Sequence, residues 1–263
     1  MKKIYASILI TNYNKQKFLN KTLRSCVNQT CKNKEILLYD DCSTDNSINI
    51  IKKFKNIKLI SNKKKKYISG PLNQIDGLKK LIKIAKGDII FLLDSDDQFK
   101  KNKLKDICNY LKINKKKNFL QDVPFNKKLN RKIYLKERKF NLTIWPRFYP
   151  TSTIVVIKKF LKNYSKIDLS NQFPNLEIDA RICIFAHLNN EFTQIEKSFT
   201  IYNFDENGIT SNYKKFRKNW WLKRLEAFQY MSHISKKLNI KFNKGFDFYI
   251  TKLVNFLIRP NMS

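Results

Sequence analysis

Short, mostly apolar runs alternate with helical patterns along the first 114 residues. The runs are rich in β-branched and aromatic residues, which is typical of strands buried on both faces of a parallel sheet; they lie at residues 4–11, 35–39, 57–60 and 89–93. Between them, apolar residues recur every three or four positions, which predicts amphipathic helices at about 15–29, 48–54, 72–85 and 104–111. This alternation implies right-handed crossovers and a doubly wound, α/β class parallel sheet.

Carboxylates follow two of these runs. Asp41 stands just after the second run, Asp94 ends the fourth, and Asp96 and Asp97 come next. Open α/β sheets bind their ligands at the carboxyl ends of their strands, so we expect Asp41 and Asp94 to lie at the same edge. Asp94 and Asp96 suit a hard divalent cation, which takes oxygen ligands and often shares them with substrate phosphates. An acidic turn without a ligand is the alternative, because Asp and Ser are common in turns.

The second half of the chain is less regular. Strands are expected at 119–123, at 154–157 and within 192–204, and an apolar-rich helix at 246–258. The stretch 121–141 is polar and basic with no clear period, so we expect it to form a surface excursion.

Composition narrows the class of protein. With 42% hydrophobic and 13% aromatic residues among 263, the chain is too apolar for a disordered protein and can bury a core. No apolar run approaches the ~20 residues that cross a bilayer. The basic and apolar start ends too early, at 11–15, for a secretory signal, so a cytoplasmic protein is expected. The five cysteines form no Cys-x-x-Cys pair, which favours reduced thiols.

The net charge of +33 raises the question of a nucleic-acid or anionic-membrane partner. Lys, Asn and Ile are abundant throughout, however, and a genome biased towards A and T would produce that composition without a selected partner. The sequence lacks a helix-turn-helix, zinc or ribonucleoprotein signature, so no specific nucleic acid is expected as a partner. It also lacks the glycine-rich loops of dinucleotide and P-loop sites.

Three motifs occur in order: 7–14 (SILITNYN), 39–45 (YDDCSTD) and 91–97 (FLLDSDD). On these motifs the chain resembles family 2 of the inverting glycosyltransferases, which have the GT-A fold. The resemblance implies a Rossmann-like, mostly parallel sheet sandwiched by helices, an irregular acceptor-binding part and C-terminal helices. It also implies a nucleoside-diphosphate sugar donor of the UDP or GDP type and a Mn²⁺ or Mg²⁺ cofactor.

The same resemblance implies roles for individual residues. Thr11, Tyr13 and Asp41 would hold the base and ribose of the donor. Asp94 would contact the ribose or the metal-bound diphosphate, and Asp96, with Asp94, would bind the metal. The residues expected to bind the sugar nucleotide are Thr11, Tyr13, Asp41, Asp94, Ser95 and Asp96. Asp40 is expected to be structural.

The catalytic base is expected near the start of a helix at about 178–186. Inverting transfer needs a group that takes the proton of the acceptor hydroxyl, and a carboxylate is the usual choice. The family places an Asp or Glu here, and this chain offers Asp179, which we favour, and Glu177 as the alternative. Either acid could instead only stabilise the helix dipole.

Two positions depart from the family pattern. Cys42 stands where the family often has Gly, and Asn73 falls near a position where many members carry an Arg that reaches the donor. Residues 209–224 resemble a segment that closes over the donor. One residue of this segment could therefore replace the missing contact, or the segment could simply pack a C-terminal helix; the candidates are Arg217, Trp221 and Arg224.

Two further regions allow alternatives. Trp145, Phe148 and Tyr149 lie where the family lines the acceptor pocket, so they could stack on sugar rings or pack in the core. The helix at 246–258 has cationic flanks that include Lys241 and Arg259, so it could lie on an anionic leaflet or pack on the domain.

The sequence therefore predicts a metal-dependent inverting glycosyltransferase for cell-surface polysaccharide or lipopolysaccharide, with a saccharide or lipid-linked acceptor. The expected parts are a nucleotide-sugar-binding half at 1–114, an acceptor-binding half at 115–208, and a closing segment with helices at 209–263. The protein would be cytoplasmic, with or without peripheral membrane contact. The alternatives are a basic nucleic-acid-binding α/β protein and a GT-A-like nucleotidyltransferase; the latter normally opens with a glycine-rich loop that this chain lacks.

Overall fold

The computed structural model describes residues 5–135, 147–167, 171–205, 208 and 213–258. Within them, nine strands form one sheet in the order β3-β2-β1-β4-β8-β6-β9-β5, with β7 paired to β6. The strands are β1 (Ala6–Asn12), β2 (Lys34–Asp40), β3 (Ile57–Ser61), β4 (Ile89–Asp94), β5 (Gln98–Phe99), β6 (Phe119–Asn126), β7 (Arg131–Lys132), β8 (Ile154–Ile157) and β9 (Gln194–Tyr202). The helices are α1 (Gln16–Val27), α2 (Ser47–Lys52), α3 (Gly70–Ile84), α4 (Lys103–Ile113), the 3₁₀ turn η1 (Thr151–Thr153), α5 (Lys158–Ile167), α6 (Ile178–Leu188), α7 (Lys218–Lys237) and α8 (Phe246–Ile258).

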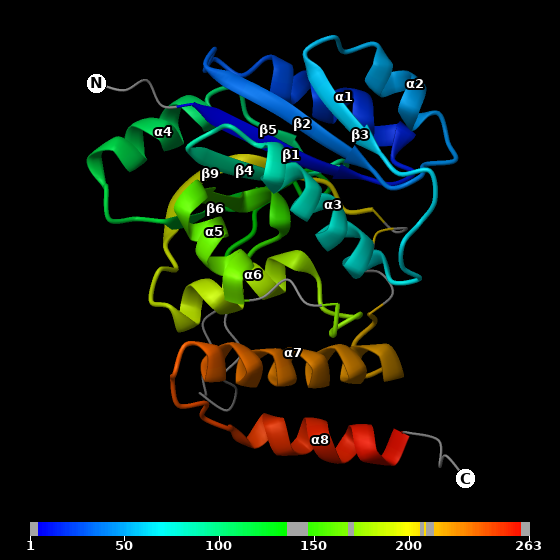
Figure 1. Cartoon of the computed structure of the whole chain (residues 1–263), viewed down its shortest axis with the longest axis vertical. Helices are drawn as coiled ribbons and strands as arrows, with labels where there is room; N and C mark the ends of the chain where they lie inside the picture. Colours follow the sequence, from blue (N-terminus) through cyan, green and yellow to red (C-terminus); the bar gives the residue numbers. More distant parts are fainter. Residues whose placement is uncertain (1–4, 136–146, 168–170, 206–207, 209–212, 259–263) are drawn as a thin grey trace.

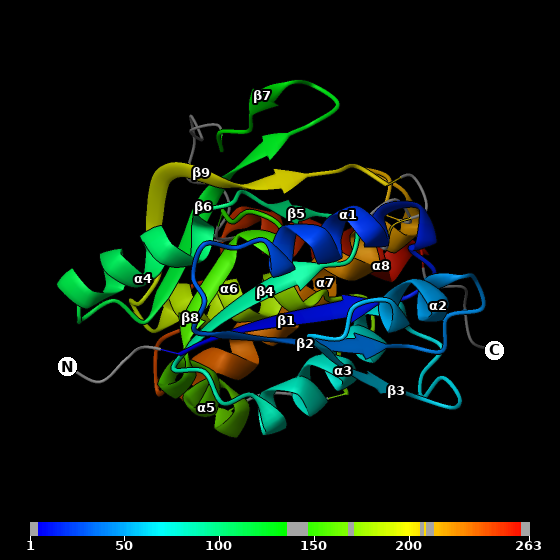
Figure 2. The same ribbon diagram turned by 90° about the horizontal axis from the view of Figure 1, so that it is seen from above.

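The first half is the doubly wound sheet that the sequence predicts. Strand β1 pairs in parallel with β2 and β4, and β2 with β3, so these arrows run the same way in Figure 2. The register places Thr11 opposite both Tyr39 and Asp94. The carboxyl ends of β1, β2 and β4 therefore meet at one edge, as the carboxylates after β2 and β4 led us to expect.

Helices cover both faces of this sheet (Figure 1). Alternate residues of each central strand enter different cores: Leu9 packs with apolar residues of α3, α5, α6 and α7, whereas Ile8 and Ile10 pack with those of α1, α2 and α4. Burial on both faces explains why these strands are continuous apolar runs in the sequence.

One glycine allows α3 to approach the sheet closely. A Cβ atom added at Gly77 would lie 2.1 Å from Cδ1 of Tyr39, so only glycine fits against this ring. The ring of Tyr39 in turn supports the loop after β2, because its hydroxyl group donates a hydrogen bond to Asp41 (3.3 Å).

The second half extends the sheet with antiparallel pairs, β4 with β8 and β8 with β6. The surface excursion expected at 121–141 is wrong in its first part, because Gln121 and Asp122 lie in β6 and are fully buried. Gln121 exchanges two hydrogen bonds with the backbone of Tyr149, and Asp122 pairs with buried Lys103. These polar residues can be buried because their partners satisfy them. Residues 136–141 lie outside the described residues.

Helix α5 was not expected from the sequence, whereas α6 and α8 were. Helices α7 and α8 form two successive layers beyond α6 (Figure 1). None of the helices among the described residues is both long and apolar enough to cross a membrane.

Candidate active site

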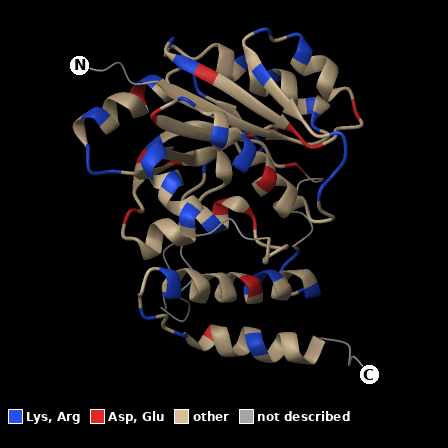
Figure 3. Cartoon of the chain, in the orientation of Figure 1, with Lys and Arg blue, Asp and Glu red and all other residues tan. Residues whose placement is uncertain are grey.

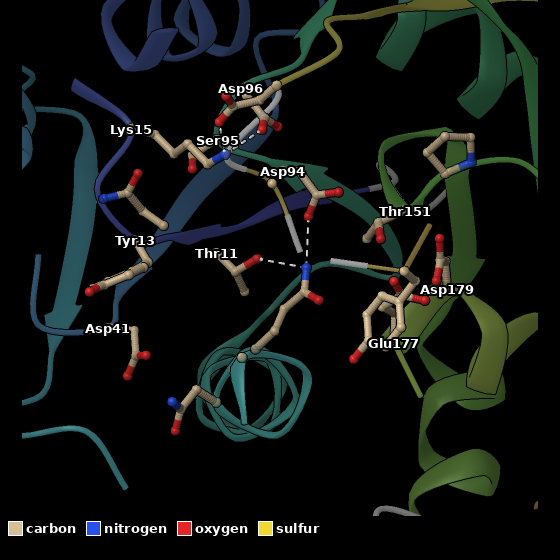
Figure 4. Close-up of a pocket in the computed structure, with 18 of the residues that line it drawn as sticks. Thr11, Tyr13, Lys15, Asp41, Asp94, Ser95, Asp96, Thr151, Glu177 and Asp179 are labelled. Carbon is tan, nitrogen blue, oxygen red and sulfur yellow. Dashed lines mark hydrogen bonds and ion pairs between the residues drawn. The ribbon is translucent and has the colours of Figure 1, made fainter. Parts of the chain in front are cut away.

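A cavity of about 810 Å³ lies at the carboxyl edge of β1, β2 and β4. Its walls combine the first half of the chain with η1, the start of α6, the end of β9 and the start of α7. All eight residues that the sequence assigns to the site line it (Figure 4): Thr11, Tyr13, Asp41, Asp94, Ser95, Asp96, Glu177 and Asp179. The fold thus brings together three sequence motifs and two acids that lie at least 80 residues further along the chain.

Asp94 ends β4 in the middle of the cavity. The amide group of Gln74 donates hydrogen bonds to the Asp94 carboxylate (2.8 Å) and to the hydroxyl of Thr11 (3.4 Å), and so links α3 to both strands (Figure 4). Burial raises the pKa of Asp94 to about 8, and the nearby charges of Asp96 and Asp179 add to this shift. The site therefore concentrates negative charge in a poorly solvated place, where a cation would be favoured.

Asp96 contacts a different partner from Asp94. Its carboxylate lies 2.9 Å from the ammonium group of Lys15, which also contacts Asp205. Burial alone lowers the pKa of Lys15, but the charges and hydrogen bonds of the two carboxylates raise it above its ordinary value. Asn203, which directly follows β9, holds the backbone of this acidic loop in place. Its side-chain amide donates a hydrogen bond to the carbonyl oxygen of Asp96 (2.6 Å).

The loop after β2 forms the outer end of the cavity. Cys42 has a φ of 57°, in the left-handed region that favours glycine, which explains why Gly suits this position in the family pattern. The Tyr13 ring is 40% exposed, and the ammonium group of Lys65 lies 3.5 Å from its centroid. This end therefore offers a partly exposed aromatic ring, with Lys65 against one face, beside the Asp41 carboxylate.

Asp40 does not line the cavity but holds the loop together. Its carboxylate accepts hydrogen bonds from the side-chain amide of Asn12 (2.6 Å) and from the backbone (2.9 Å) and hydroxyl (2.6 Å) of Ser43. With 1% of its surface exposed, Asp40 connects β1 to the loop after β2.

The two candidate bases stand at the start of α6. Glu177 occupies the N-cap position and forms an ion pair with Lys223 of α7. Asp179 lies in the first turn, where its carboxylate accepts a hydrogen bond from the backbone of Ala180 (2.7 Å); no ion pair of Asp179 is found within the described parts of the chain. Burial raises the pKa of Asp179 to about 7, Glu177 adds to the shift, and Lys223 opposes it.

The structure also locates the other predicted residues. The Asn73 side chain reaches the cavity wall, but both ends of its amide are engaged with the backbone of Tyr67. Its oxygen accepts a hydrogen bond from the N–H of Tyr67 and its nitrogen donates one to the C=O of Tyr67, which closes the loop before α3. Arg224 lines the cavity, whereas the backbone oxygen of Trp221 accepts a bond from Asn255 in α8. Arg217 is the N-cap of α7.

From the sequence, Trp145, Phe148 and Tyr149 could stack on sugar rings or pack in the core. Phe148 lines the cavity, and Tyr149 lines it as well although only 2% of its surface is exposed. The hydroxyl of Tyr149 accepts hydrogen bonds from Gln194 and from the backbone of Leu135. Trp145 lies outside the described residues.

Sequence reasoning missed several cavity residues with charged or amide side chains, among them Lys15, Gln74, Asp205 and Lys223. Lys15 directly follows the first motif and Asp205 follows β9, so both were visible in the sequence only as ordinary charged residues. Their partners are 20 to 190 positions away. No local pattern reports such contacts.

A model of the family described as Glycosyl transferase family 2 matches residues 7–167. Among curated proteins, the poly(ribitol-phosphate) beta-N-acetylglucosaminyltransferase TarP of Staphylococcus aureus is 35% identical over 118 residues, which is 43% of this chain and 34% of TarP. The UDP-Glc:alpha-D-GlcNAc-diphosphoundecaprenol beta-1,3-glucosyltransferase WfaP of Escherichia coli is 36% identical over 109 residues, 41% of this chain and 42% of WfaP. The matched part thus covers less than half the length of these relatives.

Solved structures show the same fold. Residues 1–349 of S. aureus TarS in complex with UDP-GlcNAc align with a TM-score of 0.67 at 19% identity, over 96% of this chain and 70% of that chain. The mannosyltransferase PcManGT of Pyrobaculum calidifontis, in complex with GDP-Man and Mn²⁺, aligns with a TM-score of 0.61 at 10% identity, over 98% of this chain and 70% of that chain. The predicted GT-A architecture is therefore confirmed.

Proposed function

The chain belongs to glycosyl transferase family 2, and from this premise we propose that it transfers a sugar from a nucleoside-diphosphate sugar to an acceptor hydroxyl with inversion at the anomeric carbon. One observation carries the proposal: the donor residues expected from the first three motifs and the two acids of α6 line a single cavity. Its volume of about 810 Å³ suits a ligand of nucleotide-sugar size.

The donor would lie along the edge of the sheet. The exposed ring of Tyr13 and the carboxylate of Asp41 suit a base and a ribose at the outer end. The diphosphate would lie towards Lys15 and Asp96, where one ammonium group meets the carboxylates of Asp96 and Asp205. The UDP-GlcNAc and GDP-Man complexes of the similar structures support a donor of the UDP or GDP type.

The residues present fit a divalent cation that is shared with the donor. Asp96 and Asp205 both contact one ammonium group, so this position already favours positive charge. Among the described residues, no three His, Cys, Asp or Glu side chains are grouped to hold a metal by themselves. Asp96, with Asp94, would hold Mn²⁺ or Mg²⁺ together with phosphate oxygens, as Mg²⁺ sites commonly do. The bound ion would neutralise charge on the departing nucleoside diphosphate.

Asp179 is the base in this proposal. Its carboxylate takes the proton of the acceptor hydroxyl while the hydroxyl oxygen attacks the anomeric carbon and the nucleoside diphosphate leaves. A pKa of about 7 suits a group that must accept a proton near neutral pH. Glu177, held by Lys223, would position the start of α6 rather than accept the proton.

The acceptor is a saccharide or a lipid-linked saccharide of cell-surface polysaccharide or lipopolysaccharide assembly. The activities of the relatives support this class, since one acts on poly(ribitol-phosphate) and another on a diphosphoundecaprenol-linked sugar. Residues 1–114 would bind the donor, 115–208 the acceptor, and 209–263 would close the site and add helices. The protein would act in the cytoplasm, at or near the inner face of the membrane.

Thermal-shift measurements test the proposal. UDP or GDP with Mn²⁺ should raise the melting temperature, and Asp96→Ala should abolish this shift while Asp88→Ala, at the exposed opposite end of β4, retains it. Turnover should release a nucleoside diphosphate. Release of pyrophosphate would instead indicate nucleotidyl transfer, and a failure of every nucleotide to raise the melting temperature would contradict the donor site.

A further inference from the structure

Helix α8 packs on α7 through polar side chains. Thr251 and Asn255 are 0% and 2% exposed on the face towards α7. Arg224 of α7 bonds the carboxylate of Asp247 (2.9 Å) and the hydroxyl of Thr251 (3.3 Å), and Asn255 donates to the carbonyl oxygen of Trp221 (2.9 Å). The inner face of α8 is thus largely polar, with Phe248 as its main apolar contact.

The opposite face of α8 is apolar and open to solvent. Its large side chains recur every three or four positions, which places them on one side of the helix. They are Phe246, Tyr249, Ile250, Leu253, Phe256 and Leu257, exposed by 65, 56, 37, 59, 75 and 69%. We call these six residues the α8 stripe. Folded soluble proteins rarely leave such a contiguous patch uncovered unless it binds a partner or a membrane.

The position of α8 suits a docking surface. Figure 1 shows α8 as the outermost layer, beyond α7 and at the end of the molecule away from β1, β2 and β3. Figure 3 shows that α8 itself is almost free of charged residues, whereas Lys and Arg are spread over the other elements. A flat target is therefore accessible to the whole length of the helix.

The charges around the α8 stripe indicate what this target is. Exposed lysines lie on α8 and on the chain that leads to it: Lys252 is next to Leu253, Lys241 and Lys244 precede the helix, and Lys236 and Lys237 end α7. Two copies of the chain that met through this face would bring these cations together, whereas an anionic surface would attract them.

We propose that the α8 stripe docks on an anionic lipid bilayer, with α8 lying in the plane of the interface. An apolar face bordered by lysines is the combination that holds interfacial helices on acidic lipids. The 13 residues of α8 span roughly 20 Å, long enough to lie on a leaflet and too short to cross one. Arg259 lies outside the described residues.

Docking would place the cavity close to the lipid surface. Arg224 lines the cavity and also bonds Asp247 and Thr251 of α8, so only α7 separates the cavity from the α8 stripe. In this respect the inference rests on the proposed function, since a lipid-linked acceptor would then reach the site from the membrane. Vesicle binding and nucleotide binding are measured separately, so either proposal can fail without the other.

Vesicle co-sedimentation of the full chain tests the proposal. We expect binding to vesicles of phosphatidylglycerol and phosphatidylcholine in equal parts, and none to phosphatidylcholine alone. The double variant Leu253→Glu/Phe256→Glu should lower the affinity for anionic vesicles at least roughly tenfold, because two apolar anchors are lost. The matched control Ile113→Glu/Leu129→Glu changes two apolar residues that are 82% and 54% exposed outside α8, and should bind as the unchanged chain does.

Three outcomes would overturn the inference. The first is the absence of binding to anionic vesicles. The second is that both double variants bind anionic vesicles as the unchanged chain does and that added salt abolishes this binding, which would mean that net charge alone attracts the chain. The third is a dimer seen by light scattering that Leu253→Glu/Phe256→Glu dissociates, without vesicle binding, which would assign the α8 stripe to a second copy of the chain. The nucleotide-dependent thermal shift of each variant verifies that its fold and cavity are intact.

Discussion

The ammonium group of Lys15 lies 2.9 Å from the carboxylate of Asp96 and also contacts Asp205. Lys15 precedes α1, Asp96 follows β4 and Asp205 follows β9, so one cation joins three separate parts of the chain. Only about 15% of each of these side chains is exposed, and the two carboxylates would repel each other without a positive charge between them. The same place therefore suits either the lysine or a divalent ion.

The first prediction concerns this competition. Lys15→Met removes the ammonium group and leaves its two carboxylates available, so the affinity for Mn²⁺ without nucleotide should rise by roughly tenfold. Electron paramagnetic resonance of free Mn²⁺ in a titration measures this affinity directly. Lys17→Met, an exposed neighbour, should leave it unchanged. Equal Mn²⁺ affinities of the unchanged chain and Lys15→Met would show that the ion binds elsewhere.

The second prediction concerns Gln74. Gln74→Leu removes the hydrogen bonds to Asp94 and Thr11 and leaves the half-buried Asp94 carboxylate with fewer partners, so the affinity for UDP or GDP should fall by roughly tenfold. Gln74→Glu should cost more, because it places a second carboxylate beside Asp94. Isothermal titration calorimetry measures both. Lys83→Leu, on the exposed side of the same helix, is the matched control, and an equal loss there would mean that α3 is merely perturbed.

The sequence predicted the strands and the carboxylates at their ends because both are local features. A buried parallel strand is a continuous apolar run, and the residue after it necessarily lies at the ligand-binding edge. Contacts between distant segments could not be predicted in this way. Lys15 meets Asp205 across 190 positions, and Gln74 reaches Asp94 from a helix whose sequence pattern only records its buried face.

The sequence also failed to predict which polar residues are buried. The polar residues 121 and 122 suggested a surface, although both are fully buried in β6 beside their partners. The positive φ of Cys42 could not be predicted from the cysteine itself, and the glycine that the family often has at this position was its one indication. Helix α8 shows the reverse case: its apolar pattern was evident, but only the structure shows that this face points outwards.

The third prediction concerns Asp179. Burial raises its pKa to about 7, so below that pH the carboxyl group is protonated and cannot act as the base; turnover should rise as the pH increases through about 7. Lys223 lowers this pKa, so Lys223→Met should raise it and move the acidic limb of the pH–rate profile to higher pH. The exposed Lys236→Met, at the other end of α7, should leave the profile in place.

Replacement of the two acids separates their roles. Asp179→Asn should retain the nucleotide-dependent thermal shift and lower turnover by roughly 10²–10⁴-fold, the usual contribution of a general base. Glu177→Gln should have a smaller effect on turnover because Glu177 is held by Lys223. Near-normal turnover of Asp179→Asn, together with an inactive Glu177→Gln, would transfer the role of base to Glu177.

The fourth prediction concerns the buried ion pair of Lys103 and Asp122, which supports η1 at the cavity wall. The Lys103 ammonium group, fully buried, contacts the Asp122 carboxylate (2.7 Å), the carbonyl oxygen of Ser152 (2.8 Å) and the hydroxyl of Thr200 (2.7 Å). Lys103→Met would leave a buried carboxylate without its cation, so the free energy of unfolding should fall by about 3–5 kcal/mol. Urea unfolding followed by circular dichroism measures this change.

A second substitution shows whether the loss comes from the unpaired charge. Lys103→Met/Asp122→Asn removes both charges, so it should be more stable than Lys103→Met alone, a departure from additivity that identifies a coupled pair. The exposed Lys105→Met should change the free energy of unfolding by no more than about 0.5 kcal/mol. Because the Ser152 hydroxyl accepts a hydrogen bond from the backbone N–H of Asp94, nucleotide affinity should fall with stability in Lys103→Met. Full affinity in a destabilised variant would show that η1 keeps Asp94 in place without this pair.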